Sequence, residues 1–198
     1  MSLRIIAGLG KGRKLHSPPS ITRPTSDRAR EGLFSSLVST FSSLDGLNFL
    51  DLFAGSGAVG VEALSRGVLL VDAVESNPTS AKVCEKNFDL IANLEGVGRF
   101  KVHEKTVFEF LNHTASSSYE IIYIDPPYEV ENSEVEKILK KILTLGLLSK
   151  FGVVAIERDA KAKVFSWPGG LSEAKGRSYG AGAIHYGLLS EPNRSENG

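Results

Sequence analysis

Hydrophobic positions from Leu47 onward fall into short apolar runs separated by segments of helical spacing. The apolar runs predict strands at residues 48–53, 69–75, 100–103, 119–125 and 153–157. The intervening segments predict helices that begin near residue 59 and cover 77–91 and 134–145, because their apolar residues recur every three or four positions. Near-continuous apolar strands that alternate with helices are typical of a parallel sheet covered on both faces. The pattern therefore predicts an α/β fold.

The two ends of the chain follow different patterns. Residues 172–179 and 183–189 flank Gly180 and Gly182 and predict an antiparallel hairpin. Near the start, residues 3–7 predict a strand that pairs, after a glycine-rich turn, with residues 13–16. We expect a helix to follow, capped by Thr25 or Ser26, with one apolar face. Arg28 and Arg30 lie in its first turn, and neither is expected on that apolar face.

Length and composition place the chain among ordinary globular proteins. Its 198 residues predict one compact unit at 43–190, with an appendage at 1–42 and a polar tail at 191–198. No apolar run approaches the roughly 18 residues of a membrane helix, and the first residues lack the apolar core of a signal peptide. The single cysteine, Cys84, permits no internal disulfide and is expected to be a packed thiol. We expect a cytoplasmic monomer without a metal site.

Charge is segregated although its sum is zero. Residues 1–30 carry seven lysines or arginines and one aspartate, a net charge of +6, and the remainder carries −6. Such asymmetry indicates an anionic partner for the basic end, although a merely solvated arm would show the same charges. The candidate RNA-binding residues are Lys11, Arg13, Lys14, Arg23, Thr25 and Arg28.

A glycine-rich motif follows the first predicted strand of the sheet. Gly55, Gly57 and Gly60 form Gly-x-Gly-x-x-Gly between a strand and a helix, and Glu75 ends the next strand. This spacing matches a dinucleotide fingerprint, and a purely structural turn would also satisfy it. Asp51, four residues before Gly55, would repel a pyrophosphate at the helix start. S-adenosylmethionine instead brings an ammonium and a sulfonium, which a carboxylate attracts.

A second motif, Asp125-Pro126-Pro127-Tyr128, directly follows the isoleucine-rich strand. Ligands of open parallel sheets bind beyond the carboxyl ends of the strands, so Asp125 is expected on the same rim as Asp51 and Glu75. Asp125 and the Pro126 carbonyl offer acceptors to a planar amine, and Tyr128 offers a ring on which a base can stack. The alternative is a proline-stiffened loop without a ligand.

These motifs together resemble the bacterial small-subunit rRNA guanine-N2 methyltransferase family. The likeness spans residues 3–189 and includes DLFAGSGAVGVEALSRG, the acid at Glu75, IDPPY and the leading TRPTSDR segment. It implies a Rossmann-like class I S-adenosylmethionine-dependent methyltransferase with a mostly parallel twisted sheet, a C-terminal antiparallel hairpin and a basic hairpin and helix laid over the active rim. The implied substrate is a guanine 2-amino group in 16S rRNA of the small ribosomal subunit.

The resemblance assigns a role to each motif. Catalysis is implied for Asp125, Pro126 and Tyr128, and cofactor binding for Asp51, Phe53, Gly55, Gly57, Glu75 and Thr106. The family usually has an aspartate where this chain has Thr106, so Thr106, a backbone carbonyl or Glu104 would hold the adenine. Other functions remain open at this point: methylation of adenine N6 or of a release-factor glutamine, nicotinamide-dependent oxidoreduction, and RNA binding without catalysis.

Overall fold

The computed structural model describes residues 3–18, 27–114, 118–161 and 165–190. Its centre is a seven-stranded sheet in the order β3-β2-β1-β4-β5-β7-β6. β1 (Asn48–Leu52), β2 (Leu70–Glu75), β3 (Arg99–Glu104), β4 (Tyr119–Ile124) and β5 (Leu148–Asp159) run parallel. β6 (Leu171–Tyr179) and β7 (Gly182–Leu189) add an antiparallel hairpin beside β5. The predicted fold is confirmed, including its C-terminal hairpin.

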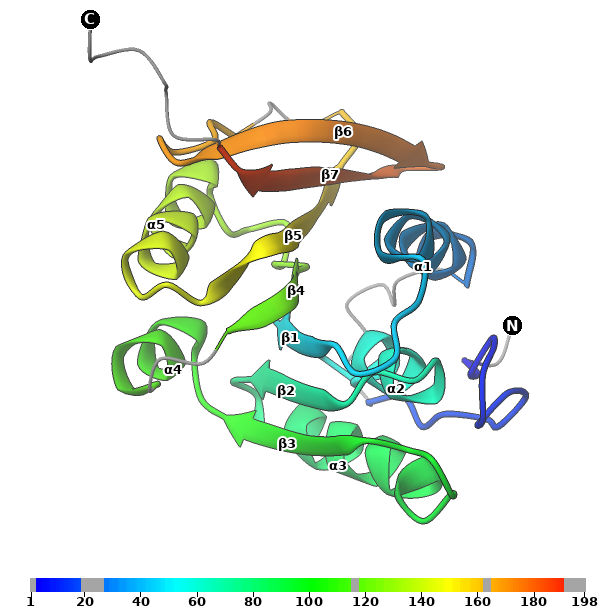
Figure 1. The fold of residues 1–198 in the computed structure, drawn as a ribbon. Helices are drawn as coiled ribbons and strands as arrows, with labels where there is room; N and C mark the ends of the chain where they lie inside the picture. Colours follow the sequence, from blue (N-terminus) through cyan, green and yellow to red (C-terminus); the bar gives the residue numbers. More distant parts are fainter. Residues whose placement is uncertain (1–2, 19–26, 115–117, 162–164, 191–198) are drawn as a thin grey trace, which may run out of the picture.

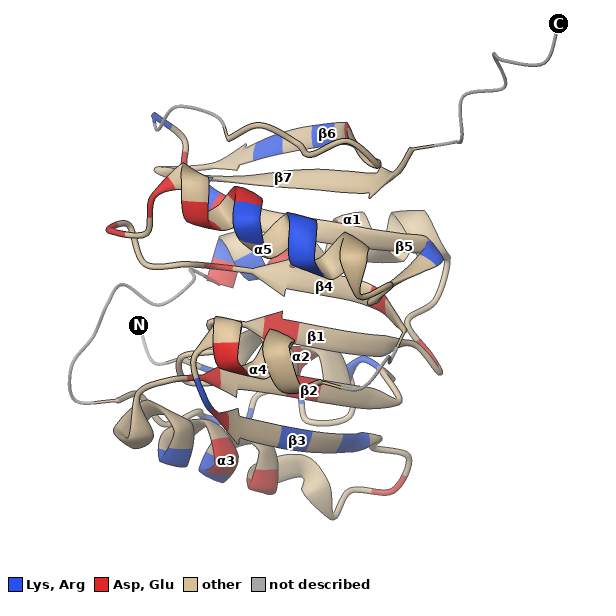
Figure 2. Ribbon diagram, turned by 90° about the vertical axis from the view of Figure 1, so that its left-hand side faces the viewer, with Lys and Arg blue, Asp and Glu red and all other residues tan. Residues whose placement is uncertain are grey.

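Helices cover both faces of this sheet (Figure 1). α4 (Val107–His113) and α5 (Asn132–Thr144) lie on one face, and α1 (Asp27–Phe41), α2 (Ala58–Ser65) and α3 (Pro78–Ala92) lie on the other. Each face has its own apolar core, because successive side chains of a strand point to opposite sides. Figure 2 shows lysine and arginine positions along α3, α5, β3 and β6, and aspartate and glutamate positions along α3, α4 and α5.

Local sequence explains where the helices begin. Asn77 caps α3 by accepting hydrogen bonds from the backbone N–H groups of Thr79 and Ser80, and Pro78 occupies the first helical position. Thr106 and Glu109 form a reciprocal capping box at the start of α4. The expected capping residues of α1, Thr25 and Ser26, lie outside the described residues, as does the predicted tail at 191–198.

The N-terminal hairpin packs against the C-terminal parts of α2 and α3. Residues 3–7 and 13–16 pair antiparallel, as predicted, through the bridge between Arg4 and Lys14. Glu62 accepts hydrogen bonds from the N–H groups of Ile6 and Ala7 at 2.7 and 3.0 Å. Gly8 approaches α2 so closely that a Cβ there would lie 1.7 Å from the carbonyl oxygen of Ser65. Only glycine fits at this contact, so Gly8 allows the hairpin to pack directly on the end of α2.

This position corrects part of the expectation that the hairpin lies over the active rim: Leu3 at its start borders the cavity at that rim, whereas its basic turn does not. α2 starts at the carboxyl end of β1 and runs back toward the start of β2, so Ser65 lies near the opposite edge of the sheet. The hairpin turn bonds to Ser65 through Leu9 and Gly10, and Arg13 donates to the carbonyl of Leu90 late in α3. The basic turn is therefore far from the rim, because the backbone of the hairpin docks onto the last turns of these helices.

Arg30 corrects a second expectation. Its side chain is fully buried, whereas we expected it to lie off the apolar face of α1. Its Nη2 donates to the carbonyl of Arg4 at 2.7 Å and to Asp27 at 2.9 Å, and its Nε lies 4.0 Å from Glu62. These partners satisfy part of the guanidinium and offset the cost of burying its charge. Arg28, by contrast, is exposed.

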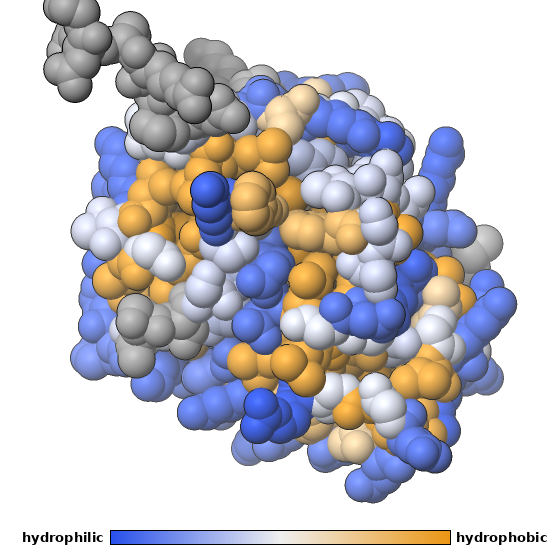
Figure 3. All heavy atoms as spheres, viewed as in Figure 1, coloured by the Kyte–Doolittle hydropathy of each residue, from blue (hydrophilic) through white to orange (hydrophobic). Residues whose placement is uncertain are grey.

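Polar side chains cover most of the face seen in Figure 1, with separate apolar patches between them (Figure 3).

Within the described ranges, no helix combines the length and the apolar character needed to cross a bilayer.

Candidate active site

A cavity of about 910 Å³ opens at the carboxyl ends of the parallel strands. Of the nine predicted catalytic and cofactor residues, eight line it: Asp51, Phe53, Gly55, Glu75, Thr106, Asp125, Pro126 and Tyr128. Two motifs that lie about 70 residues apart in the sequence therefore share one space, because β1 and β4 are neighbours in the sheet. Its volume is in the range of small-molecule sites.

The cavity wall is strongly acidic. Among the described residues that line it, the carboxylates are Asp51, Glu75, Asp125, Glu129, Glu134 and Glu157, and Lys105 is the only lysine or arginine. Such a wall attracts a cationic ligand and repels a phosphate. The composition of the cavity thus favours a ligand with an ammonium or sulfonium and disfavours a dinucleotide.

Asp51 occupies the floor of this cavity. It is 1% exposed, which corrects our expectation that it lies on an open rim, and its Oδ2 accepts a hydrogen bond from the N–H of Gly60 at 3.2 Å. Burial, followed by the nearby charge of Asp125, holds the pKa of Asp51 well above its usual range. A cation placed beside Asp51 would reverse this shift, so the residue is suited to bind positive charge.

Glu75 shapes the glycine-rich loop. Its Oε2 accepts a hydrogen bond from the N–H of Gly55 at 2.8 Å, and its Oε1 accepts one from the N–H of Asn77 at 2.7 Å. A carboxylate has about four acceptor positions, so Glu75 can hold the loop and still accept hydroxyl groups of a ligand.

The backbone of this loop has a positive φ at three residues, of which Phe53 and Gly55 line the cavity and Gly57 does not. Phe53, directly after β1, has a φ of +66°, a conformation that costs a residue with a side chain on the order of 1–3 kcal/mol. Gly55 has a φ of +56° and open space where a Cβ would lie. Such strain is typical of ligand sites, where the surrounding structure enforces the conformation.

Gly57 contributes through packing. It does not line the cavity, and a Cβ at Gly57 would lie 2.6 Å from the Sγ of Cys84. Cys84 is fully buried, and burial raises the pKa of its thiol well above the usual value. The prediction of a packed thiol is therefore confirmed, and Gly57 brings α2 and α3 close together.

The Asp125–Tyr128 loop is fixed at both ends. The N–H of Asp125 donates to the carbonyl of Leu52 at 3.3 Å, which ties the loop to the end of β1. At the other end, Arg158 donates to the carbonyl of Val130 at 2.8 Å and to Asn132 at 3.1 Å. Between these anchors, the side chain of Tyr128 is 61% exposed, as a ring must be to stack on an incoming base.

The two side chains expected to hold the adenine, Thr106 and Glu104, are not available for it in the structure. The hydroxyl of Thr106 donates to Glu109 at 2.7 Å and accepts from its N–H at 3.2 Å, so it serves the capping box. Glu104, the alternative, does not line the cavity. The backbone at the start of α4 is better placed than either side chain to hold an adenine, because Thr106, Val107 and Phe108 line the cavity there.

The predicted RNA-binding residues lie outside the cavity. Lys11, Arg13, Lys14 and Arg28 are exposed and do not line it, while Arg23 and Thr25 fall outside the described residues. The segments that flank residues 19–26 do reach the cavity, through Ser17 and Pro18 before the gap and Ala29 after it. No metal-binding cluster of histidine, cysteine, aspartate and glutamate occurs among the described residues.

Three side chains near Asp125 were not predicted from the sequence to belong to the site. Tyr123 interrupts the isoleucine run of β4, and Glu157 and Arg158 lie near the end of β5. The rule that ligands bind beyond the carboxyl ends of parallel strands would have pointed to Glu157. Arg158 has no such signal, because its partners are Val130 in the loop before α5 and Asn132 at the first position of α5, both distant in sequence.

Comparison with known proteins gives one consistent result. Residues 3–187 match the model of a family described as conserved hypothetical protein 95. The ribosomal RNA small subunit methyltransferase D of Escherichia coli K12 is 30% identical over 196 residues, which cover 98% of this chain and 93% of the relative. Bacillus subtilis YlbH, provisionally named an rRNA methyltransferase, is 31% identical over 185 residues, covering 90% of this chain and 94% of YlbH.

A solved structure has the same fold. The Escherichia coli protein yhhF, provisionally named a methyltransferase, superposes with a TM-score of 0.80 at 26% identity, covering 96% of this chain and all of yhhF.

Proposed function

The chain belongs to the conserved hypothetical protein 95 family of rRNA methyltransferases, and from this membership we propose that it methylates the exocyclic 2-amino group of a guanine in 16S rRNA. S-adenosylmethionine is the methyl donor. The observation that carries the proposal is that Asp51 and Glu75 share one cavity with the Asp125–Tyr128 loop. A cation-binding half and an amine-binding half thus lie side by side.

The residues of the cofactor half fit this donor. Asp51, buried and surrounded by other acids, faces the positively charged methionine end, and Glu75 accepts the ribose hydroxyls while holding Gly55. The strained turn at Phe53 and the open space at Gly55 leave room for the donor along the loop. The start of α4 at Thr106 borders the adenine.

The residues of the acceptor half prepare the amine. When bound, the donor offers a methyl group that the guanine N2 lone pair attacks, and the carbon–sulfur bond breaks with its electrons left on a neutral sulfur. Asp125 and the Pro126 carbonyl accept the two N2–H hydrogens and orient the lone pair, while Tyr128 stacks on the flipped base. The methylated nitrogen, now cationic, releases a proton to Asp125 or to solvent.

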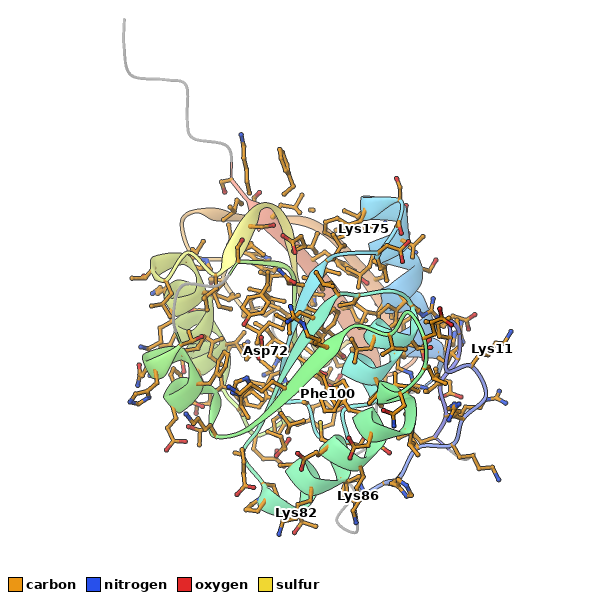
Figure 4. The ribbon with its side chains drawn as sticks, turned by 60° about the horizontal axis from the view of Figure 1, so that its bottom comes forward. Lys11, Asp72, Lys82, Lys86, Phe100 and Lys175 are labelled. Atoms are coloured by element: carbon orange, nitrogen blue, oxygen red, sulfur yellow. The ribbon has the colours of Figure 1, made fainter. Side chains whose placement is uncertain are left out.

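RNA binding is assigned to the basic surfaces outside the cavity. We assign phosphate contacts to Lys11, Arg13 and Lys14 on the hairpin and to Arg28 on α1. From the sequence we assign RNA contacts also to Arg23 and Thr25, which lie outside the described residues. Lys11 extends outward from the hairpin, and Lys82 and Lys86 extend outward from α3 (Figure 4). Because the hairpin turn lies far from the cavity, the RNA contacts two separated surfaces, and we propose that one cytoplasmic monomer provides both.

A methylation assay tests this function. Small ribosomal subunits and naked 16S rRNA are incubated with the protein and a labelled donor, and the modified nucleotide is mapped. We expect label on N2 of one guanine, and label on an adenine or on protein would refute the guanine assignment.

Asp125→Ala should lower the methylation rate by about 100-fold or more, because Asp125 is assigned to the target amine. The calorimetric affinity for S-adenosylmethionine should be retained.

A further inference from the structure

Glu157 lies next to Asp125 on the same face of the sheet. The register pairs Tyr123 with Ala155 and Ile124 with Ile156, so Asp125 and Glu157 occupy adjacent positions on neighbouring strands. Residues two apart on a strand point to the same side, which places Asp125 and Glu157 on the face occupied by Tyr123. Both carboxylates line the cavity.

Two neighbours fix the position of the Glu157 carboxylate. The hydroxyl of Tyr123, a side chain only 1% exposed, donates to Oε2 of Glu157 at 2.7 Å. On the side of β7, a Cβ at Gly182 would lie 3.2 Å from Oε1, so glycine leaves the space that this oxygen needs. Burial and the charges of Asp125 and Glu157 hold the pKa of Tyr123 well above its usual value, so Tyr123 remains a donor. The cavity therefore presents a fixed acceptor beside Asp125.

We propose that Glu157 determines base specificity by accepting the N1–H of the target guanine, and that Tyr123 positions it. This inference rests on the proposed function. Two ring nitrogens flank the amine-bearing carbon of guanine, and one of them, N1, carries a hydrogen, so two adjacent carboxylates match the adjacent N1–H and N2–H donors. Asp125 and the Pro126 carbonyl hold N2, and Glu157 holds N1.

Other methylated amines lack a second donor next to the amine. In adenine and cytosine the ring nitrogen beside the exocyclic amine is a bare acceptor, and in a glutamine amide the neighbouring atom is a carbonyl oxygen. A carboxylate that faces such a lone pair is repelled and loses its hydrogen bond, and sites built for a hydrogen bond reject analogues that lack it. Glu157 therefore separates guanine from the other substrates that an Asp-Pro-Pro-Tyr loop could orient.

The test compares guanine with 2-aminopurine at the mapped nucleotide of an RNA fragment. 2-Aminopurine keeps the 2-amino group, but its N1 is a bare acceptor. We expect the wild-type protein to prefer guanine in kcat/KM by about ten- to hundredfold, the typical loss of a hydrogen bond to a charged group. Glu157→Gln should reduce this preference at least tenfold, because the glutamine amide can donate to N1 of 2-aminopurine. Tyr123→Phe should reduce it several-fold, because the carboxylate keeps its charge and loses its fixed position.

Glu173→Gln is the matched control. It removes the same charge from β6, outside the cavity, and should leave the preference unchanged. If Glu157→Gln and Tyr123→Phe both slow the two substrates equally, their roles are structural and the inference is overturned. If the wild-type protein does not methylate guanine N2 at all, the proposed function itself fails, which the mapping reveals before any variant is made.

Discussion

Two buried carboxylates, Glu62 and Asp51, lie eleven residues apart and have opposite surroundings. Glu62, fully buried in α2, accepts hydrogen bonds from two backbone N–H groups of the hairpin and from Arg66 at 2.7 Å, with Arg30 nearby. Asp51, as deeply buried at the end of β1, accepts a hydrogen bond from Gly60 and lies near Asp125 and Glu75.

The difference distinguishes a carboxylate suited to a structural role from one suited to bind a cationic ligand. The negative charge of Glu62 is balanced within the protein, so its burial needs no ligand. The environment of Asp51 opposes its ionisation, and a cationic ligand would relieve that cost. Two carboxylates of equal burial can therefore be assigned to different tasks by their neighbours alone.

The largest effect that would sharpen this comparison is on stability. Glu62→Ala should lower the free energy of unfolding by about 3–5 kcal/mol, because Arg30 and two backbone N–H groups lose their buried partner. Chemical denaturation measures this loss, with the exposed acid of α1, Glu31→Ala, as control. A loss of less than about 1 kcal/mol, within the usual range for surface substitutions and caps, would show that the charge of Glu62 is not structural.

The next effect is on ligand affinity. Asp51→Asn should weaken S-adenosylmethionine binding by about 1.5–3 kcal/mol, because a charge-assisted contact to the donor is lost. The asparagine oxygen can still accept from Gly60, so the loop should keep its shape. Calorimetry measures the change, and an unaltered affinity would remove Asp51 from the cofactor site.

The same variant should have the opposite effect on stability. Asp51 titrates near pH 3.9 when unfolded and higher when folded, so its favourable contribution is present below pH 3.9 and is lost as pH rises through the folded pKa. Without ligand at neutral pH, Asp51→Asn should therefore raise the free energy of unfolding by about 0.5–2 kcal/mol. Thermal unfolding at pH 4 and pH 8 checks the sign, since the gain should grow with pH. A variant less stable than wild type at pH 8 would contradict it.

The smallest effect concerns the surface of the hairpin that Glu62 anchors. Replacing Lys11 and Lys14 with alanine should weaken RNA binding and flatten the plot of log affinity against log salt by about 0.7–0.9 for each lost phosphate contact. Arg13 is left intact because it donates to the carbonyl of Leu90 and supports the docking. Parallel salt plots for wild type and variant would mean that the hairpin turn contacts no phosphate.

Sequence alone predicted the parts of the structure that depend on local order. The strand-to-helix turn at Gly55 and the meeting of Asp51 with Asp125 at one edge follow from periodicity and from the rule on strand ends. The seven-residue helix α4 is too short for periodicity to reveal.

The failures involve partners distant in sequence. Arg30 was expected off the apolar face of α1 because two of its partners, the carbonyl of Arg4 and the carboxylate of Glu62, are 26 and 32 residues away and are brought to it only by folding. The hairpin was placed over the rim because nothing in its own sequence indicates that Ser65 and Asn87 receive its backbone. Tyr123 and Glu157 likewise meet through strand register, which pattern alone does not supply.

The docked hairpin also has a consequence for biosynthesis. Its backbone is held by Glu62, Ser65 and Asn87, which follow it by 55 to 71 residues. During translation, at roughly 5–20 residues per second, the hairpin is synthesised several seconds before these partners. The hairpin is therefore synthesised well before the residues that hold its backbone, and its docking has to wait for them.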